Sequence, residues 1–92
     1  MNNATRIERI RQRLMTSLNP EHLEVEDEGH LHVGHAGARE GKGHFRVTVI
    51  APKFAGLSMI KRHKLIYDAV GDMMDTDIHA LSIDARPPAD AP

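Results

Sequence analysis

Histidine is the residue type in this chain whose number and spacing most readily support chemistry. Seven histidines occur in 92 residues, and His30, His32 and His35 lie within six positions of one glycine-rich stretch. Imidazole is a common ligand of transition metals, and it titrates near neutral pH. Because the chain contains no cysteine, a site that needs thiolate ligands must take them from another molecule. The histidines are therefore the first candidates for a binding site.

The three clustered histidines and His79 differ in the support that the neighbouring sequence offers. His30, His32 and His35 stand among few apolar residues, where a solvated surface position is the ordinary alternative to a metal ligand. His79 belongs to an alternating segment and is in phase with Leu81, so we expect a strand to hold its ring. The alternative for His79 is a histidine at the edge of the core with its own hydrogen-bond partners.

Two further histidine positions carry less information about function. His63 falls on an apolar helical stripe, which favours a structural role over a ligand role. His44 begins an expected strand, and its position alone indicates no function.

Charged residues separate along the expected second helix. Residues 67–79 contain four acidic residues and no basic one, whereas residues 52–66 contain four basic residues and no acidic one: Lys53, Lys61, Arg62 and Lys64. This order opposes the helix dipole, which favours anions at the start of a helix and cations at its end. The basic segment is either an ordinary solvated face or a surface for an acidic protein or a phosphate backbone.

Apolar spacing predicts the elements that must position these residues. Steps of three and four predict a helix over residues 5–18, with Thr5 and Glu8 as a capping box. Alternation predicts strands over residues 22–28, 44–51 and 78–84, with a long glycine-rich loop over residues 29–43. A second helix should begin after a Ser58 cap. Its apolar stripe is expected to be continuous over five positions: Met59, His63, Ile66, Val70 and Met73.

The order of these elements predicts an α/β (α+β) fold of the form αββαβ. The first two strands can pair antiparallel through their loop, and the helical crossover favours parallel pairing of the second and third. We therefore expect a three-stranded mixed sheet with both helices packed on one face. Residues 1–86 should form a single domain, followed by a disordered tail over residues 87–92.

Composition excludes several classes of function. The net charge is −1, from 12 basic and 13 acidic residues, and only three residues are aromatic, too few for a platform that stacks single-stranded bases. No segment reaches the length of an apolar membrane span, so we expect a cytoplasmic protein. The zinc-protease, nucleotide-binding-loop and dinucleotide-binding motifs are missing from the sequence, and we expect no enzymatic activity.

Four motifs together resemble those of BolA proteins. In chain order they are HFRV (residues 44–47), FAGLS (54–58), KRHKLIY (61–67) and IHAL (78–81). The resemblance covers about residues 5–86, and the combined order and spacing are more specific than any one motif. It implies the BolA fold, which is similar to class II KH domains and agrees with the predicted element order.

The resemblance also implies a partner and a cofactor. BolA proteins share a bridging [2Fe–2S] cluster with a monothiol glutaredoxin and glutathione, which supply the thiolates. The histidine of the last-strand motif is one ligand in the family, which implies His79 here. The second is a His or Cys of the loop between the first two strands. Family spacing implies His35, nine residues before His44, with His30 and His32 as alternatives.

Further expectations concern partners and the main alternative function. Lys61, Arg62 and Lys64 are expected to contact the partner, whose bound glutathione carries carboxylates. We expect the cluster-free protein to be a monomer. Some BolA proteins are described as regulators that bind DNA, so a transcriptional regulator that uses the same basic residues on duplex DNA is the alternative.

Overall fold

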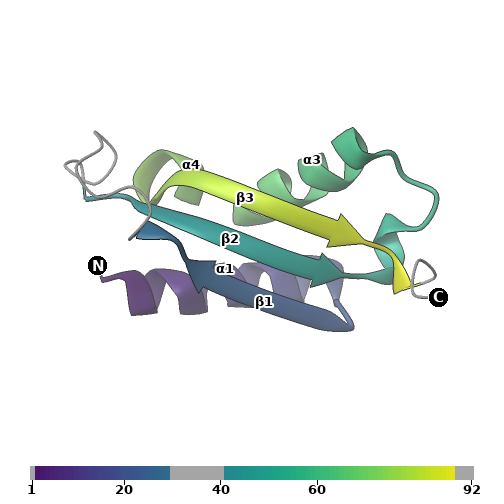
Figure 1. The fold of residues 1–92 in the computed structure, drawn as a ribbon, viewed down its shortest axis with the longest axis horizontal. Helices are drawn as coiled ribbons and strands as arrows, with labels where there is room; N and C mark the ends of the chain where they lie inside the picture. The colour runs from purple at the N-terminus through teal and green to yellow at the C-terminus, as the bar shows by residue number, and fades with distance from the viewer. Residues whose placement is uncertain (1, 30–40, 89–92) are drawn as a thin grey trace.

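The computed structural model describes residues 2–29 and 41–88. The chain forms a three-stranded sheet, and Figure 1 shows the two longer helices lying behind it. The elements are α1 (Asn3–Leu18), β1 (His22–Asp27), β2 (Gly43–Ile50), the 3₁₀ helix η2 (Pro52–Phe54), α3 (Met59–Val70), α4 (Met73–Thr76) and β3 (Ile78–Arg86). The predicted αββαβ order of the longer elements is confirmed, and η2 and α4 are short helices within the described residues that the prediction did not include.

The sheet has the predicted mixed topology, in the order β1-β2-β3. β2 pairs antiparallel with β1 and parallel with β3. β1 ends, and β2 and β3 begin, at the same end of the sheet (Figure 1). The ends of the segment between β1 and β2 therefore lie beside the start of β3.

The core lies between the sheet and the two longer helices. Ile10 and Leu14 of α1 and Ile66 of α3 are fully buried in one cluster with Val47 and Val49 of β2. Alternate residues of β2 face this cluster, as the period-two pattern predicts. Both helices therefore cover the same face of the sheet, as expected.

The first helix begins two residues earlier than predicted. Asn2 is its N-cap, and the Asn2 side chain accepts a hydrogen bond from the Thr5 backbone N–H. The predicted capping box was wrong, because Thr5 already lies inside the helix. Asn is as good an N-cap as Ser or Thr, and it satisfies the same free backbone donor.

The predicted continuous stripe of the second helix was wrong at both of its ends. Ser58 caps α3 as expected, but Met59 is 56% exposed. The helix ends at Val70, where Gly71 takes a φ of 53°, a conformation that glycine adopts at little cost. Met73 is buried from the separate helix α4. Arg13 closes this junction by donating to the Val70 carbonyl at 2.6 Å and to Asp72 at 2.9 Å.

The chain ends differ slightly from the expected boundaries. β3 continues to Arg86, and the following Pro87 is buried. Residues 89–92 lie outside the described residues, so the extent of the expected tail stays a prediction. Among residues 2–29 and 41–88, no helix combines the length and the apolar character that crossing a membrane requires.

Candidate functional site

His79 lies near the start of β3 and is exposed. The pairing of β2 with β3 is irregular at this point: Gly43 is opposite Ile78, and His44 is opposite Ala80. His79 is thus the extra residue of a β-bulge, a feature that commonly redirects a side chain beside a functional site. The prediction that a strand holds His79 is confirmed.

The bulge also changes which residue at the start of β3 faces the core, whereas Leu81, Ile83 and Ala85 face it as regular alternation predicts. Regular alternation would place His79 on the same face as Leu81, but Ile78 occupies the core instead and is 1% exposed. The expectation that His79 is in phase with Leu81 was therefore wrong. The extra residue puts Ile78 in the core in place of His79 and leaves the imidazole outside it.

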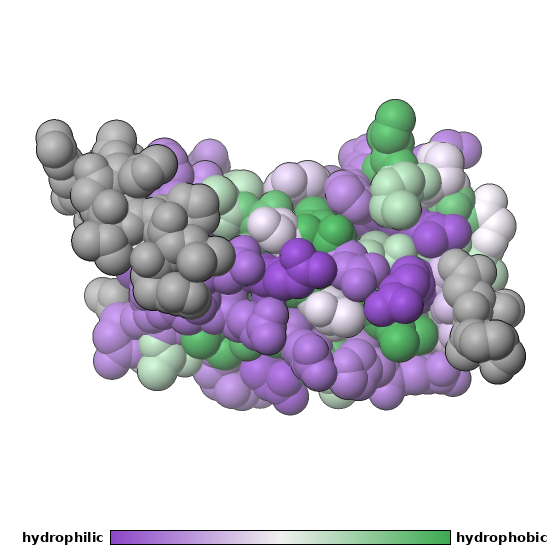
Figure 2. Space-filling view, in the orientation of Figure 1, coloured by the Kyte–Doolittle hydropathy of each residue, from purple (hydrophilic) through white to green (hydrophobic). Residues whose placement is uncertain are grey.

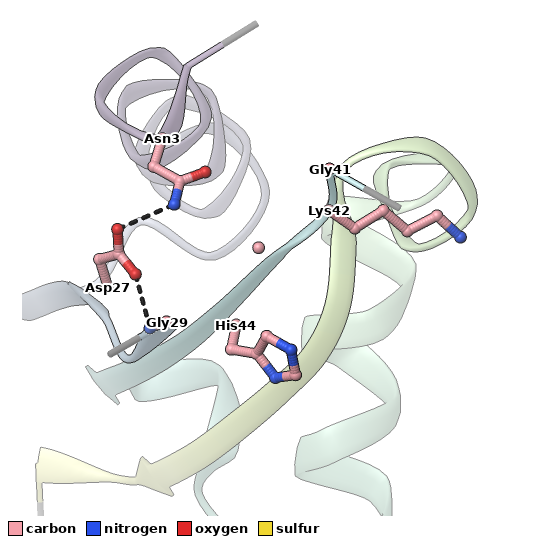
Figure 3. A pocket seen from close by; sticks show the side chains of 7 residues that line it. Asn3, Asp27, Gly29, Gly41, Lys42 and His44 are labelled. Carbon is pink, nitrogen blue, oxygen red and sulfur yellow. Dashed lines mark hydrogen bonds between the residues drawn. The ribbon is translucent and has the colours of Figure 1, made fainter. Parts of the chain in front are cut away.

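His44 is the residue that lies against His79. Their ring centroids are 5.0 Å apart, and the ring planes are tilted by 55°. His44 is only 5% exposed, although it alternates with Phe45, which faces the helices. Its ring lies over β3 in Figure 3. The sequence interpretation missed this residue, because its position at the start of a strand does not reveal the bulge across from it.

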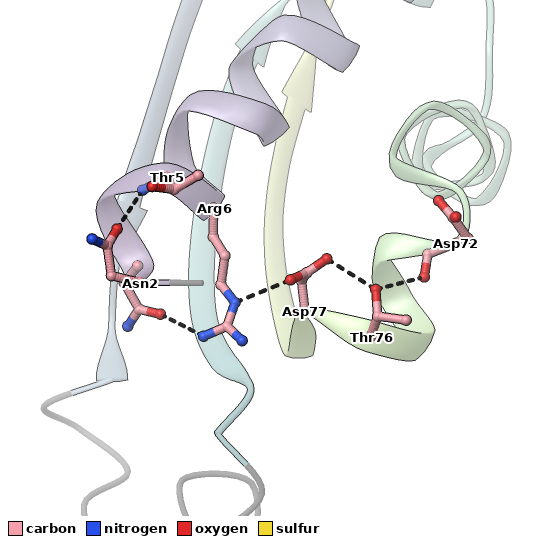
Figure 4. Close-up of polar contacts among 7 residues, drawn as sticks. Asn2, Thr5, Arg6, Asp72, Thr76 and Asp77 are labelled. Atoms are coloured by element: carbon pink, nitrogen blue, oxygen red, sulfur yellow. Dashed lines mark hydrogen bonds and ion pairs between the residues drawn. The ribbon is translucent and has the colours of Figure 1, made fainter.

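A polar network anchors the chain immediately before His79. Arg6 of α1 donates to Asp77 at 3.2 Å and to Asn3 at 3.0 Å (Figure 4). Thr76 donates to the other Asp77 oxygen at 2.9 Å. The Gly43 backbone N–H donates to the Asp77 carbonyl at 2.9 Å. Asp77 is thus held by three elements two residues before the exposed histidine.

Asp77 remains a carboxylate in this setting. Burial alone would raise the pKa of Asp77, but the hydrogen bonds from Thr76 and Arg6 and the charges of Arg6 and Arg9 outweigh burial and hold the pKa below its ordinary value. The Arg6 and Asp77 side chains are 12% and 9% exposed. This ion pair is therefore shielded from solvent more than a surface pair would be.

A polar hollow lies beside the same end of the sheet. It has a volume of about 480 Å³, and its lining includes Asn3, Asp27, Gly41, Lys42 and His44 (Figure 3). Asp27 forms part of its wall by accepting from Asn3 at 2.9 Å and from the Gly29 N–H at 2.7 Å. The first bond joins α1 to the end of β1, and the second holds Gly29 beside the same carboxylate.

The three clustered histidines lie outside the described residues. His30, His32 and His35 all belong to the undescribed range 30–40. The described flanks of this range, Gly29 and Gly41, lie at the end of the sheet where β3 begins. The assignment of His35 as a ligand, and the alternatives His30 and His32, stay predictions.

The expected basic contact residues lie at the other end of the sheet. Arg62 donates to the Ala85 carbonyl near the end of β3, and position 85 lies six steps along the strand from position 79, or about 20 Å at ~3.3 Å per residue. Lys61 is exposed, and Lys64 forms an ion pair with Asp68 at 3.2 Å. The structure therefore does not bring the basic residues and His79 into one site.

An exposed apolar projection marks that same basic end. Figure 2 shows hydrophobic surface standing out over the first turn of α3. Ile60 and Met59 are the exposed hydrophobic residues of this turn, and Ile60 is 83% exposed. The sequence interpretation placed Met59 in the core and gave Ile60 no role.

The histidine end of the sheet offers one accessible histidine as a metal-ligand donor among the residues that the structure describes. Within the described part of the chain, no group of three or more histidine, cysteine or acidic residues is arranged to hold a metal ion. His79 offers one accessible imidazole, which is a chemically suitable ligand for iron. A closed four-ligand site therefore needs donors beyond the described residues.

Comparison with known proteins gives one consistent family. The sequence model of BolA-like proteins matches residues 14–90. The chain is 44% identical over 87 residues to SufE-like protein 1, chloroplastic/mitochondrial, of Arabidopsis thaliana, covering 89% of this chain and 24% of that protein. It is 37% identical over 90 residues to Protein BOLA1, chloroplastic, of the same plant, covering 95% of this chain and 56% of that protein. The chain thus spans a quarter to about half of the length of these relatives.

The fold agrees with a solved structure as well. The BolA domain of SufE1 from Arabidopsis thaliana superposes with a TM-score of 0.83 at 40% sequence identity, covering 95% of this chain and 96% of that one. That domain resembles the described chain in both sequence and architecture.

Proposed function

The chain belongs to the BolA family, and on this premise we propose that it ligates a [2Fe–2S] cluster jointly with a monothiol glutaredoxin. His79 is one ligand, and His35 is the second. The thiolates come from the partner's cysteine and from glutathione. The cluster is the cargo or the signal of this adaptor, which acts in cluster trafficking or iron regulation.

The position of His79 is the observation that carries this proposal. Its imidazole is exposed, yet its backbone lies between Asp77, which α1 and β2 hold, and Ala80, which pairs with His44. A ligand on a rigid strand keeps its geometry better than one on a loop. The segment that contains His35 joins β1 to β2 at this same end of the sheet.

The chemistry of the ligands supports a shared site. Two imidazoles can replace two thiolates on one iron of a [2Fe–2S] cluster, as they do in Rieske centres. A chain without cysteine can therefore contribute to such a cluster when its partner supplies the sulfur. Neutral imidazole also leaves the shared cluster with less negative charge than thiolate would.

Duplex DNA binding is the alternative function. The contacts that the basic residues make in the structure support it less than their spacing in the sequence does. Arg62 donates to the carbonyls of Leu57 and Ala85, and Lys53 donates to the Ser17 carbonyl. Lys64 pairs with Asp68. The net charge of −1 provides no overall attraction to phosphates. Cluster ligation therefore remains the better proposal.

The proposal is tested by mixing the cluster-free protein with cluster-loaded monothiol glutaredoxin and glutathione. Formation of a mixed complex should change the visible circular dichroism as imidazole replaces other ligands. His79→Ala should abolish the change, and His35→Ala should weaken it, whereas His32→Ala serves as the control within the loop. The ligand assignment fails if all three variants give the wild-type spectrum.

Two wider expectations remain open to measurement. The names of the two Arabidopsis relatives place those proteins in the chloroplast, or in the chloroplast and mitochondrion, so a cytoplasmic location stays a prediction for this chain. A monomeric cluster-free form likewise stays a prediction, which sedimentation velocity would check.

A further inference from the structure

We propose that His44 is a positioning residue that fixes the orientation of the His79 ring. This inference rests on the proposed role of His79 as a cluster ligand. The observation that carries it is the contact of the two rings at the bulge, with centroids 5.0 Å apart and planes tilted by 55°.

His44 is well placed to act as a fixed support. It lies on the central strand, where its carbonyl accepts from the Glu28 N–H at 2.8 Å and its register partner on β3 is Ala80. Its side chain is 5% exposed. A residue whose backbone is paired on both sides and whose ring is shielded from solvent moves little, so it can restrict whatever packs against it.

His79 needs such a support, because the bulge leaves it without a register partner. Its neighbours Ile78 and Ala80 are both placed by the sheet, and Ile78 is buried in the core. The remaining freedom is rotation of the exposed His79 side chain. A ring that is already oriented loses less entropy when it binds, which is the general benefit of preorganisation.

Two other roles for His44 are a core residue and a metal ligand, and its position argues against both. A core role would place its side chain beside Phe45 and Val47, but these residues face the helices and His44 alternates with them. A ligand role would need an accessible nitrogen, but both ring nitrogens of His44 are enclosed. Support of the neighbouring imidazole fits both the face that His44 occupies and its burial.

The inference is tested on the cluster-free protein by side-chain NMR of His79. Wild type should show one dominant χ1 rotamer for His79 and nuclear Overhauser contacts between the two rings. His44→Phe keeps a flat ring and should keep that rotamer, whereas His44→Ala should give rotamer averaging. His22→Ala removes an exposed strand histidine at the far end of the sheet and should leave His79 unchanged.

Melting temperatures show whether each variant is folded. If His44→Ala does not fold, His44→Leu takes its place, since leucine fills the space without a flat ring. The proposal is overturned if His79 keeps one rotamer when the ring at position 44 is lost. It is equally overturned if wild-type His79 already averages freely among rotamers.

A second readout uses the mixed complex with glutaredoxin and glutathione. Loss of a residue that orients a metal ligand typically weakens metal binding by about 10–100-fold, so we expect that range for His44→Ala and less than about threefold for His44→Phe. If wild type forms no mixed complex, the proposed function fails while the NMR result still decides the role of His44.

Discussion

Arg62 ties the start of α3 to the end of β3 by donating to the carbonyl oxygen of Ala85 at 3.1 Å. The same guanidinium donates to the Leu57 carbonyl at 3.0 Å, just before the helix cap. Arg62, which is expected from the sequence to contact the partner, therefore has a structural role as well. Lys61, one residue earlier, is exposed and forms the matched comparison.

Arg62→Ala should lower the free energy of unfolding by about 1–3 kcal/mol, because two charge-assisted hydrogen bonds to backbone carbonyls are lost. Lys61→Ala should change it by less than about 0.5 kcal/mol, as exposed substitutions usually do. Urea unfolding monitored by circular dichroism measures both. Equal stability of the two variants would show that the Arg62 bonds contribute nothing.

Asp77→Asn should lower the free energy of unfolding at neutral pH. It should also make the free energy of unfolding less dependent on pH in the acid range. The pKa of folded Asp77 lies below the unfolded value of 3.8, so its carboxylate stabilises the fold above about pH 3.8. That contribution is lost as the pH falls through the lower, folded pKa. We expect a loss of about 1–3 kcal/mol at pH 7 from the weakened bonds to Arg6 and Thr76.

The measurement for Asp77 is urea unfolding at several pH values between 7 and 3. The difference between wild type and Asp77→Asn should shrink at the acid end. Asp75→Asn changes an exposed neighbouring carboxylate and is the control. A difference that stays constant across this range would rule out the charge of Asp77 as the cause.

Gly43→Ala should be strongly unfavourable, because the close packing around the bulge leaves no room for a methyl group. A Cβ at this position would lie 2.4 Å and 2.5 Å from two ring atoms of Phe45. Overpacking of this kind costs about 1–3 kcal/mol. Gly56→Asn is the contrast, since no atom lies within 4 Å of a Cβ there and asparagine tolerates its φ of 77°.

Thermal and urea unfolding of the two glycine variants measure this difference. Gly43→Ala should also disturb the amide resonances of His44 and His79, because its backbone N–H holds Asp77. A Gly43→Ala protein as stable as wild type would contradict the described packing at the start of β2.

Periodicity alone was sufficient to predict the architecture. The alternation of Phe45, Val47 and Val49 marks the core face of β2, and the spacing of Ile10 and Leu14 marks the core face of α1. These signals are strong because burial follows directly from the two repeat lengths. The order of the elements then constrains the sheet to the observed topology.

The candidate site was less predictable, because it depends on a local exception to that periodicity. The IHAL motif alone does not indicate that Ile78, rather than His79, belongs to the core. The bulge arises from the register between β2 and β3, a tertiary relationship. His44 was missed for the same reason, and the break after Val70 was missed because a glycine can stand inside or outside a helix.

The absence of a DNA complex at micromolar protein is the expected outcome of a test of the alternative function. A gel shift on duplex DNA across a salt series should show no salt-sensitive complex at micromolar protein, given the net charge of −1. Lys61→Ala is the informative variant, because it should leave the fold intact. A complex that weakens with salt and is lost in Lys61→Ala would favour the regulator over the cluster adaptor.

Nitrogen hyperfine spectroscopy of the reduced mixed complex tests the shared cluster most directly. The chain is labelled with ¹⁵N-histidine, and the glutaredoxin and glutathione are left unlabelled. We predict two strongly coupled ¹⁵N nuclei in the wild-type complex, one of which His79→Ala removes. A reduced cluster without ¹⁵N coupling, or couplings that persist unchanged in His79→Ala, would contradict ligation by this chain through His79.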